Sequence, residues 1–116
     1  MTITIHKMDE VWTADDFKLG MAHCLYYRPE DQVRPGELLY AAYLEVVNYQ
    51  LGDDYFVPLD FIERVDGADS RLKLTVPLKT VMNRTWSRRP EFVARKLGRR
   101  AVLTYPDNTE AKQPVA

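Results

Sequence analysis

Cysteine and histidine are scarce in this sequence. Its 116 residues include one cysteine, Cys24, and two histidines, His6 and His23. A lone cysteine excludes a disulfide within the chain, and it fits a reducing compartment. His23 and Cys24 are neighbours in a predicted strand, so we expect their side chains to point to opposite faces of a sheet. The sequence therefore predicts no metal site and no cofactor.

Long apolar runs are also lacking. No run approaches the roughly 20 residues that a helix needs to cross a bilayer. Residues 1–7 show no basic region followed by a long apolar block, so no secretory signal is predicted and we expect a cytoplasmic protein. The five glycines are scattered along the chain and form no phosphate-binding loop.

No catalytic signature is present either. The sequence has no Cys-His-Asn order and no Gly-x-Ser-x-Gly turn. The acidic pairs Asp15-Asp16 and Asp53-Asp54 could suggest paired-carboxylate chemistry. Both fall in predicted turns, where aspartate stabilises the backbone, and we favour that interpretation. We expect the protein not to be an enzyme.

What the sequence does contain is a series of short β-type runs separated by turn residues. Residues 18–27, 41–50, 55–59 and 71–76 predict strands, and the turn at 51–54 predicts a hairpin. This spacing is typical of a small all-β barrel in a single domain.

The flanking segments complete the predicted organisation. Residues 2–5 alternate Thr and Ile and suggest a first strand, and residues 78–83 suggest a single helical turn. Residues 87–98 suggest a short helix that begins near a proline and ends at a glycine. We therefore divide the chain into a β-barrel domain over 1–86, a basic helical extension packed on it over 87–105, and a disordered tail over 106–116.

Several segments resemble the PRC-barrel superfamily, which is named after the photosynthetic reaction centre H subunit. Residues 15–20, Asp-Asp-Phe-Lys-Leu-Gly, match a turn and its glycine. Residues 43–49 match a long apolar strand, and residues 55–62 match an aromatic-Val-Pro-Leu segment. Residues 72–76 followed by 78–81 look like the tail of stress-associated bacterial members.

The resemblance, which runs from Val11 to about Trp86, implies a small free-standing bacterial protein with a six-stranded PRC-type barrel. Members of the family serve as docking modules, for example in the reaction centre H subunit and in a ribosome maturation factor, and they share no catalytic residues. Asp16 stands where the family often has glycine, so the turn there could be of another type.

Charge is strongly segregated along the chain. Residues 1–83 carry a balance of −6, whereas residues 84–100 carry +6. The seven basic residues of this basic segment are Arg84, Arg88, Arg89, Arg95, Lys96, Arg99 and Arg100. One interpretation is contact with RNA or an anionic surface. The other, which we favour, is a solvated face that pairs with the acidic part of the chain.

Six of the seven tyrosines fall within residues 26–55. Most should bridge core and solvent on strands, but Tyr43 and Tyr49 are candidate residues of a protein interface. We therefore expect a docking or adaptor module that acts through protein–protein contacts and self-associates as a homodimer. The alternative is an RNA- or anion-binding protein that uses the basic segment.

Overall fold

The computed structural model describes residues 4–29, 40–64, 71–84 and 86–105. The strands in these ranges are β1 (Glu10–Trp12), β2 (Lys18–Tyr27), β3 (Ala42–Asn48), β4 (Asp53–Pro58), β5 (Ile62–Arg64), β6 (Arg71–Leu74) and β7 (Arg99–Val102). The helices are α1 (Leu78–Asn83), α2 (Glu91–Ala94) and the 3₁₀ turn η2 (Leu59–Phe61). No helix in the described ranges is long and apolar enough to cross a membrane.

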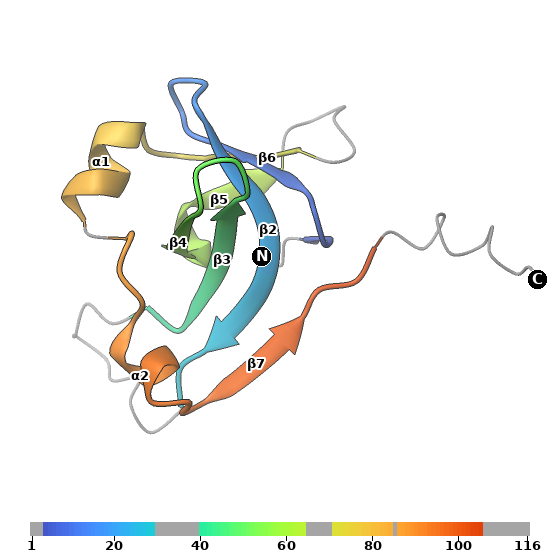
Figure 1. Ribbon diagram of the computed structural model, residues 1–116, viewed down its shortest axis with the longest axis vertical. Coiled ribbons are helices and arrows are strands. Elements are labelled where there is room, and N and C mark those ends of the chain that lie inside the picture. Colours follow the sequence, from blue (N-terminus) through green and yellow to red (C-terminus); the bar gives the residue numbers. More distant parts are fainter. Residues whose placement is uncertain (1–3, 30–39, 65–70, 85, 106–116) are drawn as a thin grey trace, which may run out of the picture.

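All of these strands belong to one open sheet (Figure 1). The order is β4-β3-β2-β1-β6-β5, and β7 pairs with β2. The mainly β class is confirmed, but the prediction of a closed six-stranded barrel is wrong. The sheet has seven strands, and its end strands β4 and β5 do not pair. The edge of β4 instead bonds the chain after α1, where the Phe56 N–H donates to the Trp86 carbonyl at 2.7 Å.

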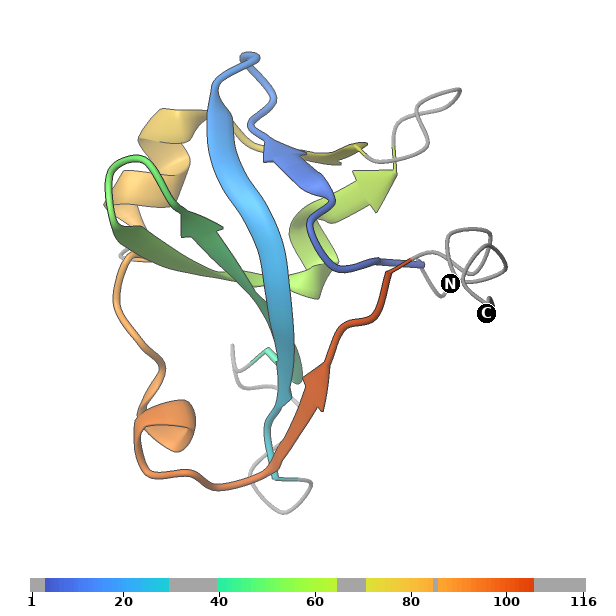
Figure 2. The same cartoon turned by 45° about the vertical axis from the view of Figure 1, so that its right-hand side comes forward.

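The sheet curls around one main core although it does not close (Figure 2). Buried residues from both ends of the strand order meet there, including Val57 of β4 and Ile62 of β5. Leu44, Leu72 and Val81 extend this cluster from β3, β6 and α1. Strong right-handed twist brings distant strands of an open sheet together in this way.

Strand β2 forms the centre of the sheet, and its predicted bounds are confirmed. It pairs with β3 along one edge, and with β1 and then β7 along the other. A Cβ atom at Gly20 would lie 2.5 Å from the Val47 carbonyl oxygen, so only glycine permits this close approach of β2 and β3.

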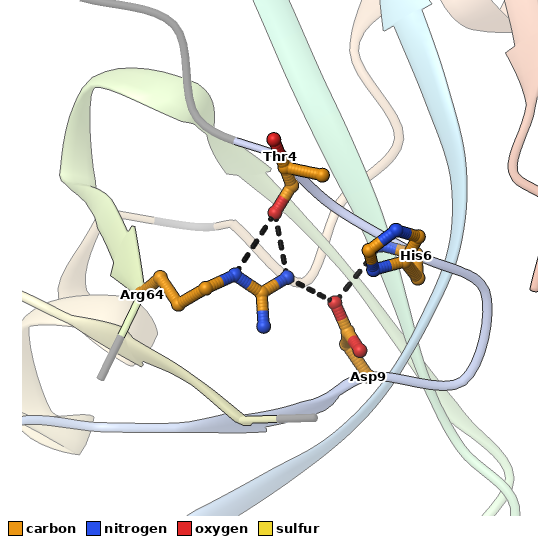
Figure 3. A network of polar contacts seen from close by, with 4 residues as sticks. All are labelled: Thr4, His6, Asp9 and Arg64. Atoms are coloured by element: carbon orange, nitrogen blue, oxygen red, sulfur yellow. Dashed lines mark hydrogen bonds and ion pairs between the residues drawn. The ribbon is translucent and has the colours of Figure 1, made fainter. Parts of the chain in front are cut away.

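A polar network fixes the N-terminal segment to β5 (Figure 3). Arg64 Nη2 donates to the Thr4 carbonyl at 2.6 Å and to Asp9 Oδ2 at 2.7 Å. The backbone N–H of His6 also donates to Asp9 Oδ2, at 2.9 Å. Asp9 is 2% exposed, so these contacts satisfy a buried carboxylate and serve the fold.

Other predicted elements differ in detail. Residues 78–83 form the expected helical turn, α1. Within residues 87–98 only Glu91–Ala94 is α-helical, and the strand β7 that follows was not predicted. Thr4 and Ile5 are not in a strand, and residues 2–3 and the proposed tail over 106–116 lie outside the described ranges. Asp16 adopts the left-handed conformation (φ 65°) that a glycine would supply.

Candidate functional site

Two features stand out on the face of the sheet that bears α2: a surface of arginines and aromatic rings, and a partly buried cluster of His23, Cys24 and Glu45. The surface depends on a second small core. Phe92 and Val93 of α2 are buried against Tyr43 and Phe56 of the sheet. Phe92 and Tyr43 have ring centroids 5.8 Å apart, a favourable tilted contact.

Arg28, which follows β2, supports the second core from the side. Its guanidinium lies 4.7 Å from the Phe92 ring centroid, and its Nε donates to the Tyr40 carbonyl at 2.8 Å. Arg28 was not predicted from the sequence as a site residue. Its place directly after an aromatic strand end, Tyr26-Tyr27, was the available signal.

Strand β7 carries the end of the basic segment onto the sheet (Figure 1). The chain reaches β2 through Gly98, which has φ +77°. A Cβ atom there would lie 2.0 Å from the Tyr27 carbonyl oxygen. Glycine is therefore required both for the backbone conformation and for the close approach.

The side chains of the basic segment contact aromatic rings more than carboxylates. Arg89 lies 5.1 Å from the Phe56 ring centroid, and Arg99 lies 4.1 Å from that of Tyr27. Arg84 Nη1 lies 3.4 Å from the Tyr40 hydroxyl, to which it donates a hydrogen bond. A guanidinium over a ring is held in place and keeps its edge N–H groups available to an anion.

Most of the basic segment forms no ion pair with the described residues of the sheet. Arg95 pairs with Glu91 of α2 at 3.4 Å. Among the described residues, no ion pair joins the segment to a carboxylate of the sheet through any of Arg88, Arg89, Arg95, Lys96, Arg99 and Arg100. Arg88 and Lys96 are exposed. The favoured interpretation of a face paired with the acidic part of the chain gains no support from these residues.

Two adjoining hollows lie on this surface, and Arg89 lines both. The smaller, of about 350 Å³, is lined by Tyr26, Arg89, Val93, Lys96, Leu97, Gly98, Arg99 and Arg100. The larger, of about 520 Å³, is lined by Tyr40, Tyr43, Phe56, Arg84, Trp86, Arg88, Arg89, Pro90 and Glu91. We call this combined region the arginine–aromatic face.

The two tyrosines proposed as interface residues lie in different environments. Tyr43 is 9% exposed and belongs to the second core, where burial raises the pKa of its hydroxyl. Tyr43 therefore offers little surface to a partner, apart from its contribution to the larger hollow. Tyr49 is 58% exposed in the turn after β3 and remains a candidate interface residue.

The second feature is a cluster of His23, Cys24 and Glu45. The expectation that His23 and Cys24 point to opposite faces is wrong, because β2 contains a bulge. Ala22 pairs with Val46 and Cys24 with Glu45, so His23 is an extra residue in β2. A bulge interrupts the alternation of side chains and can turn two neighbours toward one partner residue.

Polar contacts tie this cluster to the arginine–aromatic face. His23 Nδ1 lies 3.1 Å from Glu45 Oε1, and the Tyr26 hydroxyl donates to the same oxygen at 3.3 Å. Arg100 Nη2 donates to Cys24 Sγ at 3.4 Å. Burial, followed by the charge of Glu45, raises the pKa of Tyr26, so its hydroxyl remains a hydrogen-bond donor.

Glu45 is a functional candidate that was not predicted from the sequence. It is 6% exposed, and it is the only charged residue in the strand segment Ala42–Asn48. A lone carboxylate in an otherwise uncharged strand is a usable signal, since buried charged groups need partners.

Comparisons with known proteins do not identify a family. No protein-family model matches the chain, and neither does any curated protein or any solved structure. The resemblance to the PRC-barrel superfamily therefore stays a prediction.

Proposed function

We propose that the protein is a non-enzymatic docking module that binds an acidic, aromatic-containing segment of a partner protein on the arginine–aromatic face. One observation carries this proposal. The basic segment is fixed against aromatic rings, and its described side chains other than Arg84 form no ion pair with the sheet. Its charge is therefore available to an external anion.

The composition of the face supports a protein partner. Arginine, tyrosine and tryptophan are the residues most enriched at energetically dominant positions of protein interfaces. Tyr40, Trp86 and Arg89 line the larger hollow together. An aromatic or apolar side chain of the partner would fill such a hollow, and flanking carboxylates would meet the arginines at its rim.

Self-association is a further part of the proposal. Within the described part of the chain, β7 pairs only with β2, and its Val102 is 61% exposed. An unpaired strand edge of this kind is a template for pairing with a second copy. Light scattering should find a dimer at high protein concentration, and a strict monomer would contradict this part.

The second candidate function is binding of RNA, and it has its own supporting observation. Arg88 and Lys96 are exposed and form no ion pair among the described residues, and aromatic rings lie beside neighbouring arginines. Phosphates and bases are recognised by this combination of residues. Such binding would weaken steeply with added salt.

Affinity capture from lysate, with and without nuclease, separates the two functions. The tested forms are the native chain, the double variant Arg88→Glu/Lys96→Glu, and the control variant Lys7→Glu/Lys79→Glu, which changes the net charge equally. Docking predicts a protein partner that survives nuclease and is lost only from the Arg88→Glu/Lys96→Glu variant. Recovery of RNA that this variant loses would select the second function. A partner bound equally by all three forms would contradict both.

A further inference from the structure

We propose that His23, Cys24 and Glu45 form a binding site for a zinc ion. One ligand atom from each residue, a ring nitrogen, Sγ and a carboxylate oxygen, lies within 4.8 Å of the others. This is the one such group of three among the described residues. Zinc binding is a property separate from docking, and either proposal can be disproved without affecting the other.

The bulge in β2 is what assembles the three donors. Without the bulge, regular alternation along β2 would place His23 and Cys24 on opposite faces of the sheet. Cys24 pairs directly with Glu45 across the β2–β3 ladder. The donors therefore come from two rigid, paired strands, which is the kind of support that a precise metal site needs.

The donor chemistry favours zinc over calcium or magnesium. Calcium and magnesium prefer oxygen ligands, whereas zinc binds thiolate, imidazole and carboxylate together. In a tetrahedral zinc site with metal–ligand bonds of about 2.0 to 2.3 Å, neighbouring ligand atoms lie roughly 3 to 4 Å apart. His23 Nδ1 and Glu45 Oε1 already lie 3.1 Å apart. The Cys24 sulfur, which lies within 4.8 Å of both, is therefore no more than about 1 Å from the spacing of a tetrahedral site.

Surrounding groups match the outer shell of a metal site. Tyr26 donates to Glu45 Oε1, and Arg100 donates to Cys24 Sγ. Outer-shell hydrogen bonds of this type orient metal ligands. In the metal-free site, Arg100 also offsets one of the two negative charges that a thiolate and a carboxylate bring together, and a bound Zn²⁺ would balance both.

The three ligand residues differ in how far they are exposed to solvent. Cys24 is 1% exposed and Glu45 is 6% exposed, whereas the His23 side chain is 35% exposed. Metal can therefore reach the site from the His23 side. Three protein ligands leave a fourth position for water or an added ligand, as in zinc sites that are not purely structural.

Cobalt substitution tests this site directly, because Cys24 is the only thiol in the sequence. We expect the metal-free full chain to bind Co²⁺ with a thiolate-to-cobalt charge-transfer band in the near ultraviolet, and Zn²⁺ to displace the cobalt. Calorimetric titration with Zn²⁺ should show at least a tenfold loss of affinity in Cys24→Ser, and about a tenfold loss in Tyr26→Phe. The control His6→Gln removes the other imidazole and should retain both the band and the affinity.

Two results would overturn the zinc site: no charge-transfer band in the native chain, or equal Zn²⁺ affinity in the native chain and Cys24→Ser. The first result decides the question even if the serine variant fails to fold. Capture experiments on the arginine–aromatic face are independent of it, so failure of the zinc site leaves the docking proposal standing.

Discussion

At the scale of single residues, backbone geometry decides where the charged groups lie. Gly98 lets β7 approach β2, and a bulge at His23 turns a neighbouring pair of side chains toward Glu45. Neither effect follows from hydrophobic periodicity, because a bulge arises from pairing with another strand. The identity of the candidate basic residues was predictable from the sequence, but their contacts with aromatic rings were not.

Replacing Gly98 should detach β7 from the sheet. In Gly98→Ala the new Cβ would lie 2.0 Å from the Tyr27 carbonyl oxygen, at a residue with φ +77°. We expect a loss of at least about 2 kcal/mol in the free energy of unfolding, with faster hydrogen exchange at the β7 amides.

Gly52→Ala is the matched control for this variant. Gly52 has a similar φ of +78°, but nothing lies within 4 Å of its added Cβ. It should lose only about 1 kcal/mol, the conformational cost alone. Equal losses in the two variants would show that the close approach of β7 to β2 is not essential.

At the scale of elements, strands in which apolar and polar residues alternate clearly were predictable, but the open arrangement of the sheet was not. β2 and α1 have the predicted bounds, and β3 and β6 lie within predicted segments. β7 was missed because its sequence, Arg-Arg-Ala-Val, has little apolar alternation and only one β-branched residue. It forms because β2 is long enough to pair with β1 and β7 in succession along one edge.

Glu10 links the three-residue strand β1 to both of its neighbouring strands. The Trp12 indole N–H donates to Glu10 Oε1 at 2.9 Å, and Lys18 and Arg71 of the flanking strands lie 3.8 and 3.6 Å from the carboxylate. The indole hydrogen bond first, and the two cations after it, hold the pKa of Glu10 below its ordinary value of 4.5, against the effect of burial. The ionised carboxylate is therefore stabilised in the folded state.

A lowered pKa in the folded state makes this contribution to stability depend on pH. It is fully present above the ordinary pKa of 4.5, and it is lost as the pH falls through the lower pKa of the folded state. The native chain should therefore exceed Glu10→Gln in free energy of unfolding at pH 7, and the difference should shrink toward pH 3. Urea denaturation across this range measures it. A difference that stays constant with pH would show that the ionised form of Glu10 is not favoured by folding.

At the scale of the whole molecule, negative charge and positive charge lie in different parts of the fold. Residues 1–83, which carry the net negative charge, build most of an open, curled sheet, and the basic segment crosses one of its faces. The segregation of charge was predictable from the sequence. The face of the sheet on which the basic segment lies was not predictable. It depends on the burial of Phe92 and Val93 against β3 and β4 and on the pairing of β7 with β2. An extended anionic partner would meet both hollows around Arg89 at once.

Fluorescence anisotropy with a labelled peptide of repeating Glu-Glu-Tyr tests the arginine–aromatic face most directly. We predict saturable binding that weakens with added salt, at least about tenfold weaker binding by Arg88→Glu/Lys96→Glu, and unchanged binding by Lys7→Glu/Lys79→Glu. The same loss in both variants would show that only net charge matters. No binding by the native chain, or equal binding by all three forms, would contradict the claim that this face is the docking surface.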